Sequence, residues 1–293
     1  MKIRKSAGEV TFDAFNTFLM CGLVFLTLYP FLYVLFASFS TPTRLMQNNG
    51  MIFYPLGFQL DGYRMVFMNP MIVIGYLNTL FYVSFGTFLN LLMTTLGAYA
   101  LSRRNTLLRR PISLLIVFTM FFSGGLIPLY LQVKSLGLLD TRWALFLPSI
   151  ISAYNMIIMR TGFETIPASL EESARLDGAN DLIICFMIVF PLSLPVVAVM
   201  TLYYAVGHWN AWFHAMIFLK SRDLYPLQLI LREILVANVT STMTTAVESG
   251  TKDAMGESIK YATIIIATLP IICVYPFLQK YFIKGIMIGA IKE

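Results

Sequence analysis

The sequence predicts an all-α, polytopic membrane protein with six transmembrane helices, which we expect to form a single domain over residues 1–293. Hydrophobic residues make up 58% of the 293 positions and charged residues only 12%, too few to cover a soluble domain. Several apolar runs approach or exceed the roughly 20 residues that cross a hydrocarbon core about 30 Å thick. The basic residues that give the net charge of +6 lie at helix ends, so we expect contact with the lipid bilayer and no binding of nucleic acid.

Six apolar segments account for the predicted helices, at residues 14–38, 76–101, 111–133, 143–160, 183–206 and 262–283. The first is too long for the core of a cleaved signal peptide, so we expect it to be retained as a span. Prolines inside the spans predict bent helices, because each proline removes a backbone donor. These prolines are Pro30, Pro128, Pro148, Pro191, Pro195, Pro270 and Pro276.

Two long segments, 39–75 and 220–261, are too polar to span, and we expect both to fold over the outer mouth. Residues 207–219 are aromatic and amphipathic, which predicts an extension of the fifth span or a short re-entrant element. Neither long segment has the Ser/Gly-rich composition of a linker, and no internal repeat is visible, which favours a single domain.

The distribution of lysine and arginine predicts the orientation. Twelve lie in the two tails and in the loops 102–110 and 160–182, whereas nine lie on the opposite side. Seven of those nine belong to the long segments 39–75 and 220–261, which contribute little to the positive-inside rule. Both termini and the loop 160–182 are therefore expected in the cytoplasm.

Residues 164–195 form a polar, acidic segment between apolar runs. The segment holds five of the fifteen acidic residues of the chain, namely Glu164, Glu171, Glu172, Asp177 and Asp181. An acidic, helix-forming segment at a membrane exit has the composition of a docking surface for a cytoplasmic partner. Carboxylates in such a surface can pair with arginine or lysine side chains of the partner.

Local sequence patterns within this segment predict a short helix with a defined end. Pro167 suits the first turn of a helix, and Ser169 to Glu172 has the spacing of a capping box. Gly178 is expected to end the helix, since glycine readily adopts the left-handed conformation. Asn180 or Asp181 can then cap the next helix.

The predicted helix has a face of small side chains between carboxylates. Leu170, Ser173, Ala174 and Asp177 recur at a spacing of three and four residues, next to Glu171 and Glu172. Small side chains on this face would let a partner approach closely.

The pattern Glu172-Ser173-Ala174, then Gly178, Ile188 and Leu194-Pro195, resembles the EAA loop of ABC-importer permeases. The stretch LEESARLDGA at 170–179 is similar to the carbohydrate-uptake (maltose-type, MalG-like) family, with Ser173 where alanine is usual. The resemblance covers nearly the whole chain and includes Asn78-Thr79-Leu80, Ala98 to Arg103, and Met159-Arg160-Thr161.

Two other regions indicate a branch of that family. Ser123 to Pro128, Gly137 to Thr141 and the tail from Gln279 to Gly285 are similar to LplC/YtcP-like permeases of polysaccharides or complex oligosaccharides. The resemblance implies a type I importer permease with the MetI-like fold, in a bacterial cytoplasmic membrane. It also implies that the chain forms half of a path for a sugar or oligosaccharide.

The same resemblance implies a set of partners. These are a second homologous permease, two ATP-binding cassette subunits that bind ATP and magnesium, and an extracytoplasmic solute-binding protein. The chain itself would be no enzyme and would hold no cofactor or metal. The implied ATPase-coupling residues are Glu171, Glu172, Ser173, Ala174, Asp177 and Gly178, with the tail from Lys280 reaching the ATPases and the segment 220–261 entering the binding protein.

Residues that could contact the solute are less clearly marked. Trp209, Asn210 and Trp212 could form a sugar-stacking platform, although interfacial aromatics usually anchor helices at the headgroup level. Asn78, Tyr154 and Asn155 could line the path or form hydrogen bonds between helices. The two histidines, His208 and His214, lack companions at metal-ligand spacing.

Two other functions remain as alternatives, an ion-coupled secondary transporter and a membrane-embedded enzyme. Both would need ionisable or nucleophilic groups at membrane depth, and the predicted spans contain no Asp, Glu, Lys or Arg clearly inside them. The sequence has no GxxxxGK[ST] motif for binding ATP. Import of a non-sugar solute also remains open.

Overall fold

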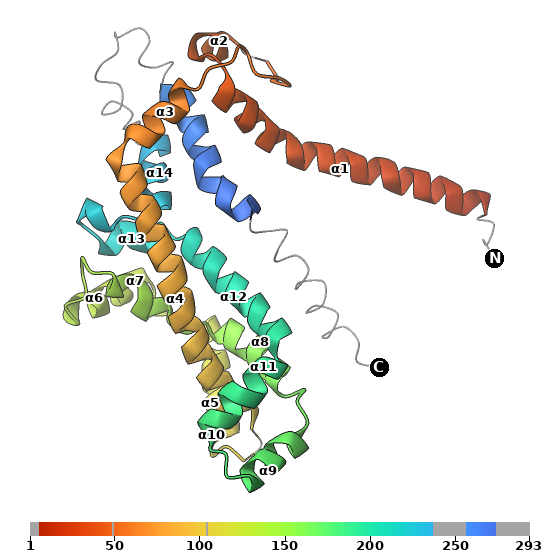
Figure 1. The fold of residues 1–293 in the computed structure, drawn as a ribbon, viewed down its shortest axis with the longest axis vertical. Coiled ribbons are helices and arrows are strands. Elements are labelled where there is room, and N and C mark those ends of the chain that lie inside the picture. Colours follow the sequence, from red (N-terminus) through yellow and green to blue (C-terminus); the bar gives the residue numbers. More distant parts are fainter. Residues whose placement is uncertain (1–5, 49, 104, 237–255, 274–293) are drawn as a thin grey trace. The chain divides into compact units, whose positions relative to one another are not determined.

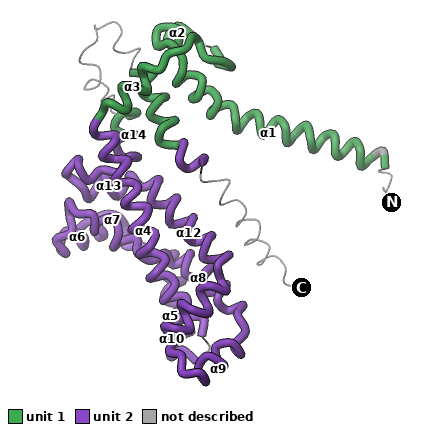
Figure 2. Tube along the Cα trace, viewed as in Figure 1, with its two compact units in different colours: residues 1–69, 233–268 green, residues 70–232, 269–293 purple. Residues whose placement is uncertain are grey.

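The computed structural model describes residues 6–48, 50–103, 105–236 and 256–273. This described part is helical and contains no strand. The chain divides into two compact units, residues 1–69 with 233–268 and residues 70–232 with 269–293 (Figure 2). Three single helices are long and apolar enough to cross a membrane, and three bent helix pairs raise that number to six in the described residues.

The first unit contains α1 (Ala7–Phe39), α2 (Pro42–Gln47) and α3 (Asp61–Met68). α1 begins with a capping box formed by Ser6 and Glu9, and it continues through Pro30 as one helix. The most apolar window of α1 has none of its residues buried within the chain. The C-terminal end of α1 is joined to α3 by a hydrogen bond between the Ser38 and Tyr63 hydroxyls, 2.7 Å long.

The second unit is organised around α4 (Pro70–Ser102), which packs against α8 (Ala153–Phe163) and α12 (Leu194–Trp209). Their shared core includes the fully buried side chains of Met159, Phe163 and Met200. Small residues let these helices approach closely, as is common in membranes. A Cβ at Gly162, for example, would lie 2.7 Å from a methyl carbon of Val196.

Three spans of this unit are broken. α5 (Arg109–Phe121) and α6 (Leu126–Ser135) meet at 114°. α7 (Trp143–Phe146) and η1 (Leu147–Ser149) meet α8 at 55°. The fifth span begins with α10 (Asp181–Ile183), a π-helical segment η2 (Ile184–Val189) and α11 (Phe190–Leu192), and it then turns by 89° into α12.

The breaks follow the predicted prolines in two of the three cases. Pro148 lies in η1, and Pro191 and Pro195 flank the turn at Ser193. The break between α5 and α6 instead lies at Gly125, which has φ +85°, and not at Pro128. A backbone with φ +85° and ψ 177° favours glycine, because a Cβ would crowd the adjoining peptide groups of its own backbone.

The remaining elements connect these spans. α9 (Ala168–Leu176) follows α8, and α13 (Phe213–Phe218), η3 (Arg222–Leu224) and α14 (Leu227–Val236) follow α12. The aromatic stretch 207–219 thus contains the end of α12 and the separate short helix α13. A last helix occupies Gly256–Cys273.

Several predictions lie wholly or partly outside the described residues. The predicted sixth span, 262–283, is described only to residue 273, and the tail from Lys280 is not described. Residues 237–255 of the external segment 220–261 also fall outside. The observed helices extend the predicted spans at several ends, most clearly for α1 and α4, which begin seven and six residues before predicted positions 14 and 76.

Candidate functional site

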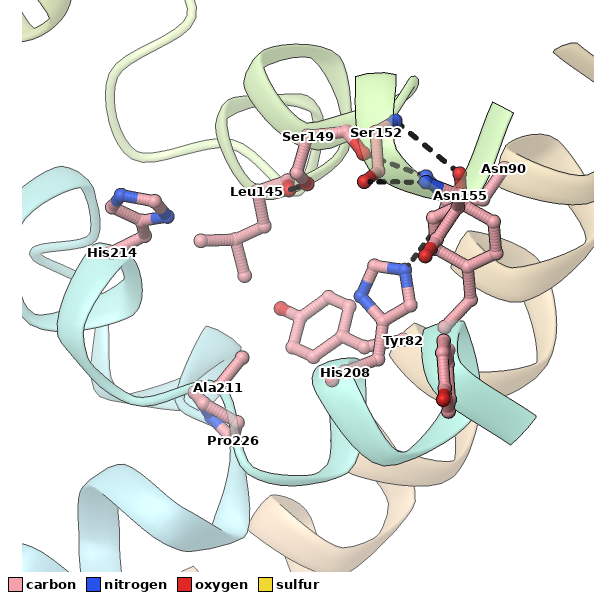
Figure 3. A pocket seen from close by; sticks show the side chains of 13 residues that line it. Tyr82, Asn90, Leu145, Ser149, Ser152, Asn155, His208, Ala211, His214 and Pro226 are labelled. Atoms are coloured by element: carbon pink, nitrogen blue, oxygen red, sulfur yellow. Dashed lines mark hydrogen bonds between the residues drawn. The ribbon is translucent and has the colours of Figure 1, made fainter. Parts of the chain in front are cut away.

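A polar cavity of about 300 Å³ lies within the second unit, among α4, α8, α12 and α13 (Figure 3). Its walls carry hydroxyl, amide and imidazole groups together with apolar surface, and the lining contains no carboxylate, lysine or arginine. The lining residues are Tyr82, Asn90, Leu145, Ser149, Ser152, Asn155, Tyr203, Tyr204, Gly207, His208, Ala211, His214 and Pro226. Such groups can exchange hydrogen bonds with an uncharged or anionic polar solute.

Asn90 joins three elements at the wall of this cavity. Its amide nitrogen donates to the carbonyl oxygens of Ser149 at 2.7 Å and Ile150 at 2.9 Å, where the backbone breaks before α8. Its Oδ1 lies 2.6 Å from His208 Nε2 on α12. Because Asn90 is 2% exposed, these bonds replace those that water would make.

Gly86, one turn before Asn90 on α4, makes room for this contact. A Cβ at Gly86 would lie 2.6 Å from His208 Nε2, closer than unbonded atoms can approach. The absence of a side chain therefore lets the imidazole reach α4. The hydrogen bond between Asn90 and His208 depends on that close approach.

Tyr204 and Asn155 form the neighbouring part of the wall. The Tyr204 hydroxyl lies 2.7 Å from Thr94 Oγ1 and accepts from the backbone N–H of Ser152 at 3.3 Å. The backbone N–H of Asn155 donates to Ser152 Oγ, which caps α8. The Asn155 side-chain amide has no hydrogen bond to another described residue, so it can bind a solute in the cavity (Figure 3).

Asn155 is the one predicted path residue that lines this cavity. Asn78 is instead buried in a structural network, in which its amide donates to the carbonyls of Asp223 at 2.6 Å and Tyr225 at 3.2 Å. Tyr154 is 54% exposed and lies outside the lining. Of the two expected roles for Asn78, the structure therefore shows hydrogen bonding between elements and not lining of the cavity.

The predicted aromatic platform also lies outside this lining. Trp209 is buried with its ring centroid 5.9 Å from that of Tyr76, so its faces pack within the protein. The Trp212 ring lies under the guanidinium of Arg232, 4.9 Å from its centroid. Asn210 is exposed at the C-terminal end of α12.

Sequence reasoning missed most of the cavity lining. Asn90 is a strongly polar residue inside a long apolar run, and this feature could have marked it. His208 carries no such signal in the sequence, because a lone histidine near an apolar run does not show whether it faces a cavity. In the described residues no group of three His, Cys, Asp or Glu side chains could hold a metal ion.

The second candidate site is α9 and the turn that follows it, beyond the C-terminal end of α4 (Figure 1). The predicted capping box is wrong: α9 begins at Ala168, with Pro167 as its N-cap and no side-chain capping bond. Pro167 has ψ 132°, so it precedes the first turn that it was expected to occupy. The extended conformation of Pro167 places the helix start before Ser169, so that hydroxyl cannot act as the cap.

The predicted end of α9 is confirmed. Gly178 has φ +85°, and its N–H donates to the Arg175 carbonyl at 3.1 Å. The Ala179 N–H donates to the Ala174 carbonyl at 2.9 Å, which completes a Schellman motif. Asn180 then caps α10, with its side chain accepting from the Ile183 N–H at 2.9 Å.

The implied coupling residues of α9 divide into a group that packs against the rest of the unit and a group that is exposed. Glu171 is 7% exposed and forms an ion pair with Arg103, and Ala174 packs against the shared core of the unit. Glu172, Ser173, Asp177 and Gly178 are exposed. The sequence reasoning also missed an apolar part of this surface, because Leu176 is 90% exposed and Leu170 is 44% exposed.

A cleft of about 820 Å³ separates α9 from the ends of α4 and α8. Glu164 at its edge pairs with Arg109 and, at 2.9 Å, with Arg160. Burial lowers the pKa of the Arg103 guanidinium, which still remains charged because arginine titrates far above neutral pH. Acidic and basic side chains that form ion pairs with one another therefore line the cleft.

Bent apolar helices around a polar cavity, with the short helix α9 beyond them, form the architecture expected of a membrane transport subunit. Residues 93–288 match the family described as binding-protein-dependent transport system inner membrane component. The chain belongs to this family. It is thus a permease subunit of a binding-protein-dependent importer. The family that the sequence resembles and the all-helical permease fold are both confirmed.

Curated relatives match over nearly the full length. The chain is 44% identical over 270 residues to the polygalacturonan/rhamnogalacturonan transport system permease protein YtcP of Bacillus subtilis (strain 168), covering 90% of this chain and 92% of that protein. It is 43% identical over 287 residues to Protein LplC of the same organism, covering 98% and 96%.

A solved structure shows the same fold. It is described as a bacterial ABC transporter involved in the import of the acidic polysaccharide alginate. The match has a TM-score of 0.87 and 34% identity, and it covers 96% of this chain and 100% of that chain.

Proposed function

We propose that this permease carries a saccharide derived from a polysaccharide, and that it is driven by separate ATP-binding subunits. The observation that carries the saccharide assignment is the cavity among α4, α8 and α12, whose polar groups are hydroxyls, amides and imidazoles. Tyrosine rings beside hydrogen-bonding groups suit sugar rings, which present apolar faces and polar edges. The names of the similar proteins, which refer to polygalacturonan, rhamnogalacturonan and alginate, agree with this class of solute.

The cavity also bears on the charge of the solute. Its lining contains no carboxylate and includes two histidines, His208 and His214. A carboxylate-free wall does not repel an anionic sugar, whereas acidic lining residues would. We therefore propose an oligosaccharide that contains uronic acids as the preferred solute.

Energy for import would enter through α9. Its exposed surface combines Glu172 and Asp177 with the apolar side chains of Leu170 and Leu176. A short helix closed by a Schellman motif, with charged and apolar side chains exposed, suits a groove on a partner that carries basic residues. We propose that this partner is an ATP-binding subunit, two of which would act with a second permease and an extracytoplasmic solute-binding protein.

This assignment places α9 in the cytoplasm. The termini would then lie in the cytoplasm too, in agreement with the lysine and arginine count of the sequence. ATP and magnesium would be bound by the partner subunits. This chain would contribute no catalytic residue.

The test is uptake by the assembled importer in proteoliposomes, with the binding protein added outside and ATP enclosed. Galacturonic acid oligosaccharides and maltotriose serve as probes. We expect ATP-dependent uptake of the former, and a rate about fivefold lower in Asn155→Ala, since one hydrogen bond to a solute contributes about 1 kcal/mol. Asn210→Ala, exposed and outside the cavity lining, is the matched control and should behave as the native protein.

Two results would contradict the proposal. Uptake of solutes other than saccharides, with none of either probe, would overturn the solute assignment. Uptake driven by an ion gradient without ATP-binding subunits would overturn the proposed source of energy.

A further inference from the structure

Glu171 does not share the exposure of its neighbour Glu172, although both belong to the acidic segment. The Glu171 side chain is 9% exposed and pairs with Arg103, whose side chain is 16% exposed. Arg103 directly follows the last residue of α4, so the pair joins α9 to the end of that helix. A docking partner can contact Glu172 but has little access to Glu171.

Arg103 is held from several sides. Its guanidinium donates to the Phe163 carbonyl at the end of α8 at 3.2 Å, and its Nε donates to Ser102 Oγ at 2.9 Å. It also lies 5.0 Å from the centroid of the Tyr99 ring, in cation–π contact. One side chain thus connects the ends of α4 and α8 with the buried face of α9.

The other ion pairs at this end of the unit are more open to solvent. Arg175 and Asp181 have side chains 52% and 62% exposed, so solvent screens their attraction. Glu164, which pairs with Arg109 and Arg160, is 33% exposed. The pair between Arg103 and Glu171 is therefore the ionic contact of α9 that solvent weakens least.

α4 connects this pair to the cavity. Asn90 lies twelve residues before Ser102 on the same continuous helix, about 18 Å away at 1.5 Å per residue. A shift of the C-terminal end of α4 would therefore reach the hydrogen bond between Asn90 and His208. The bent spans on either side lack such a straight, unbroken connection.

We propose that Arg103 is a positioning residue for energy coupling, which binds the buried Glu171 so that a movement of α9 is transmitted to α4 and then to the cavity wall. This inference rests on the proposed docking of an ATP-binding subunit on α9. It assigns different roles to two adjacent acids: Glu172 faces the partner, and Glu171 ties the helix to its own chain.

The test compares Arg103→Gln, Glu171→Gln and the double variant in the complete importer in proteoliposomes. The quantity measured is the number of ATP molecules hydrolysed per galacturonic acid oligosaccharide imported, in complexes shown to contain every subunit. Each single variant should raise this ratio at least fivefold. The double variant should be no worse than either single one, because it leaves no buried charge unpaired.

Arg103→Lys keeps the charge but lacks the planar, rigid set of donors with which the guanidinium contacts Glu171, the Phe163 carbonyl and the Tyr99 ring, so an intermediate ratio is expected. Arg160→Gln disrupts only the more open cluster and should stay within twofold of the native ratio. Unchanged ratios in Arg103→Gln and Glu171→Gln would overturn the proposal. Loss of the assembled complex in both single variants would also overturn it, in favour of a role in folding alone.

Cross-linking separates this proposal from the proposed function. The variant Glu172→Cys should cross-link to the ATP-binding subunit. Cross-linking with unchanged coupling ratios would contradict only the role of Arg103. Absence of cross-linking from several positions on α9 would contradict the proposed docking itself.

Discussion

Replacing Asn90 with leucine removes three hydrogen bonds from the cavity wall while keeping the branching and the number of heavy atoms of the side chain. The lost bonds are those to the carbonyls of Ser149 and Ile150 and to the His208 imidazole. Leucine cannot replace any of them. The gain in apolar character contributes little in return, because lipid tails are as apolar as leucine.

The expected cost follows from the number of bonds. Hydrogen bonds between membrane helices average about 0.6 kcal/mol each, so three contribute about 2 kcal/mol. The two carbonyls lie at the break before α8, where the helix itself offers them no donor, and an unsatisfied buried group costs about 1–3 kcal/mol. We therefore expect Asn90→Leu to destabilise the protein by about 2–4 kcal/mol.

The assay is the thermal unfolding midpoint of the purified importer in detergent, together with saccharide uptake. At about 2–4 °C per kcal/mol for a chain of this size, a loss of 2 kcal/mol lowers the midpoint by about 4–8 °C. Asn210→Leu, at an exposed position, should change it by about 1 °C or less. An Asn90→Leu protein with the native midpoint and native uptake would refute the reasoning.

Two further predictions concern turns outside the spans. Gly178→Ala should cost about 1–2 kcal/mol because φ is +85° there, and it should lower uptake by loosening the end of α9. The control Gly22→Ala lies within α1 with nothing within 4 Å of its added Cβ, so it should lower neither uptake nor midpoint. Equal uptake in the two variants would contradict this prediction. Hydrogen bonds from the Ser221 hydroxyl and from the backbone N–H groups of Ser221 and Lys220 hold the pKa of the Asp140 carboxyl below its usual range. The stabilisation is thus fully present above the unfolded pKa of about 3.9 and is lost as the pH falls through the folded pKa. The midpoint difference between native protein and Asp140→Asn should be constant from pH 6 to 7 and should shrink below about pH 4; a difference that does not change with pH would contradict the assignment.

Local features were predictable because their causes are local. The apolar runs required helices, whatever their neighbours, since a backbone in lipid must satisfy its own hydrogen bonds. Gly178 and Asn180 ended α9 and began α10 as expected, because their conformations depend on adjacent backbone groups. The predicted capping box was wrong, although the cause is again local. The helix begins at Ala168, one residue before Ser169, with Pro167 as its N-cap.

Contacts between distant segments were not predictable in this way. Asn90 and His208 are 118 positions apart, and the sequence alone offers no measure of their approach. Asn78 and Asn155 looked equivalent as polar residues near spans. The structure satisfies Asn78 with backbone carbonyls and leaves the Asn155 amide at the cavity.

The sequence by itself determined a helical membrane protein, its family and the position of its acidic, capped helix. These follow from composition, hydrogen bonding along the chain and a local motif. Only the tertiary structure decided that Glu171 faces inward while Glu172 faces outward. The physical reason is that a buried carboxylate needs a positive partner held in place. The packing of α4, α8 and α9 places Arg103 next to Glu171, on the buried face of α9.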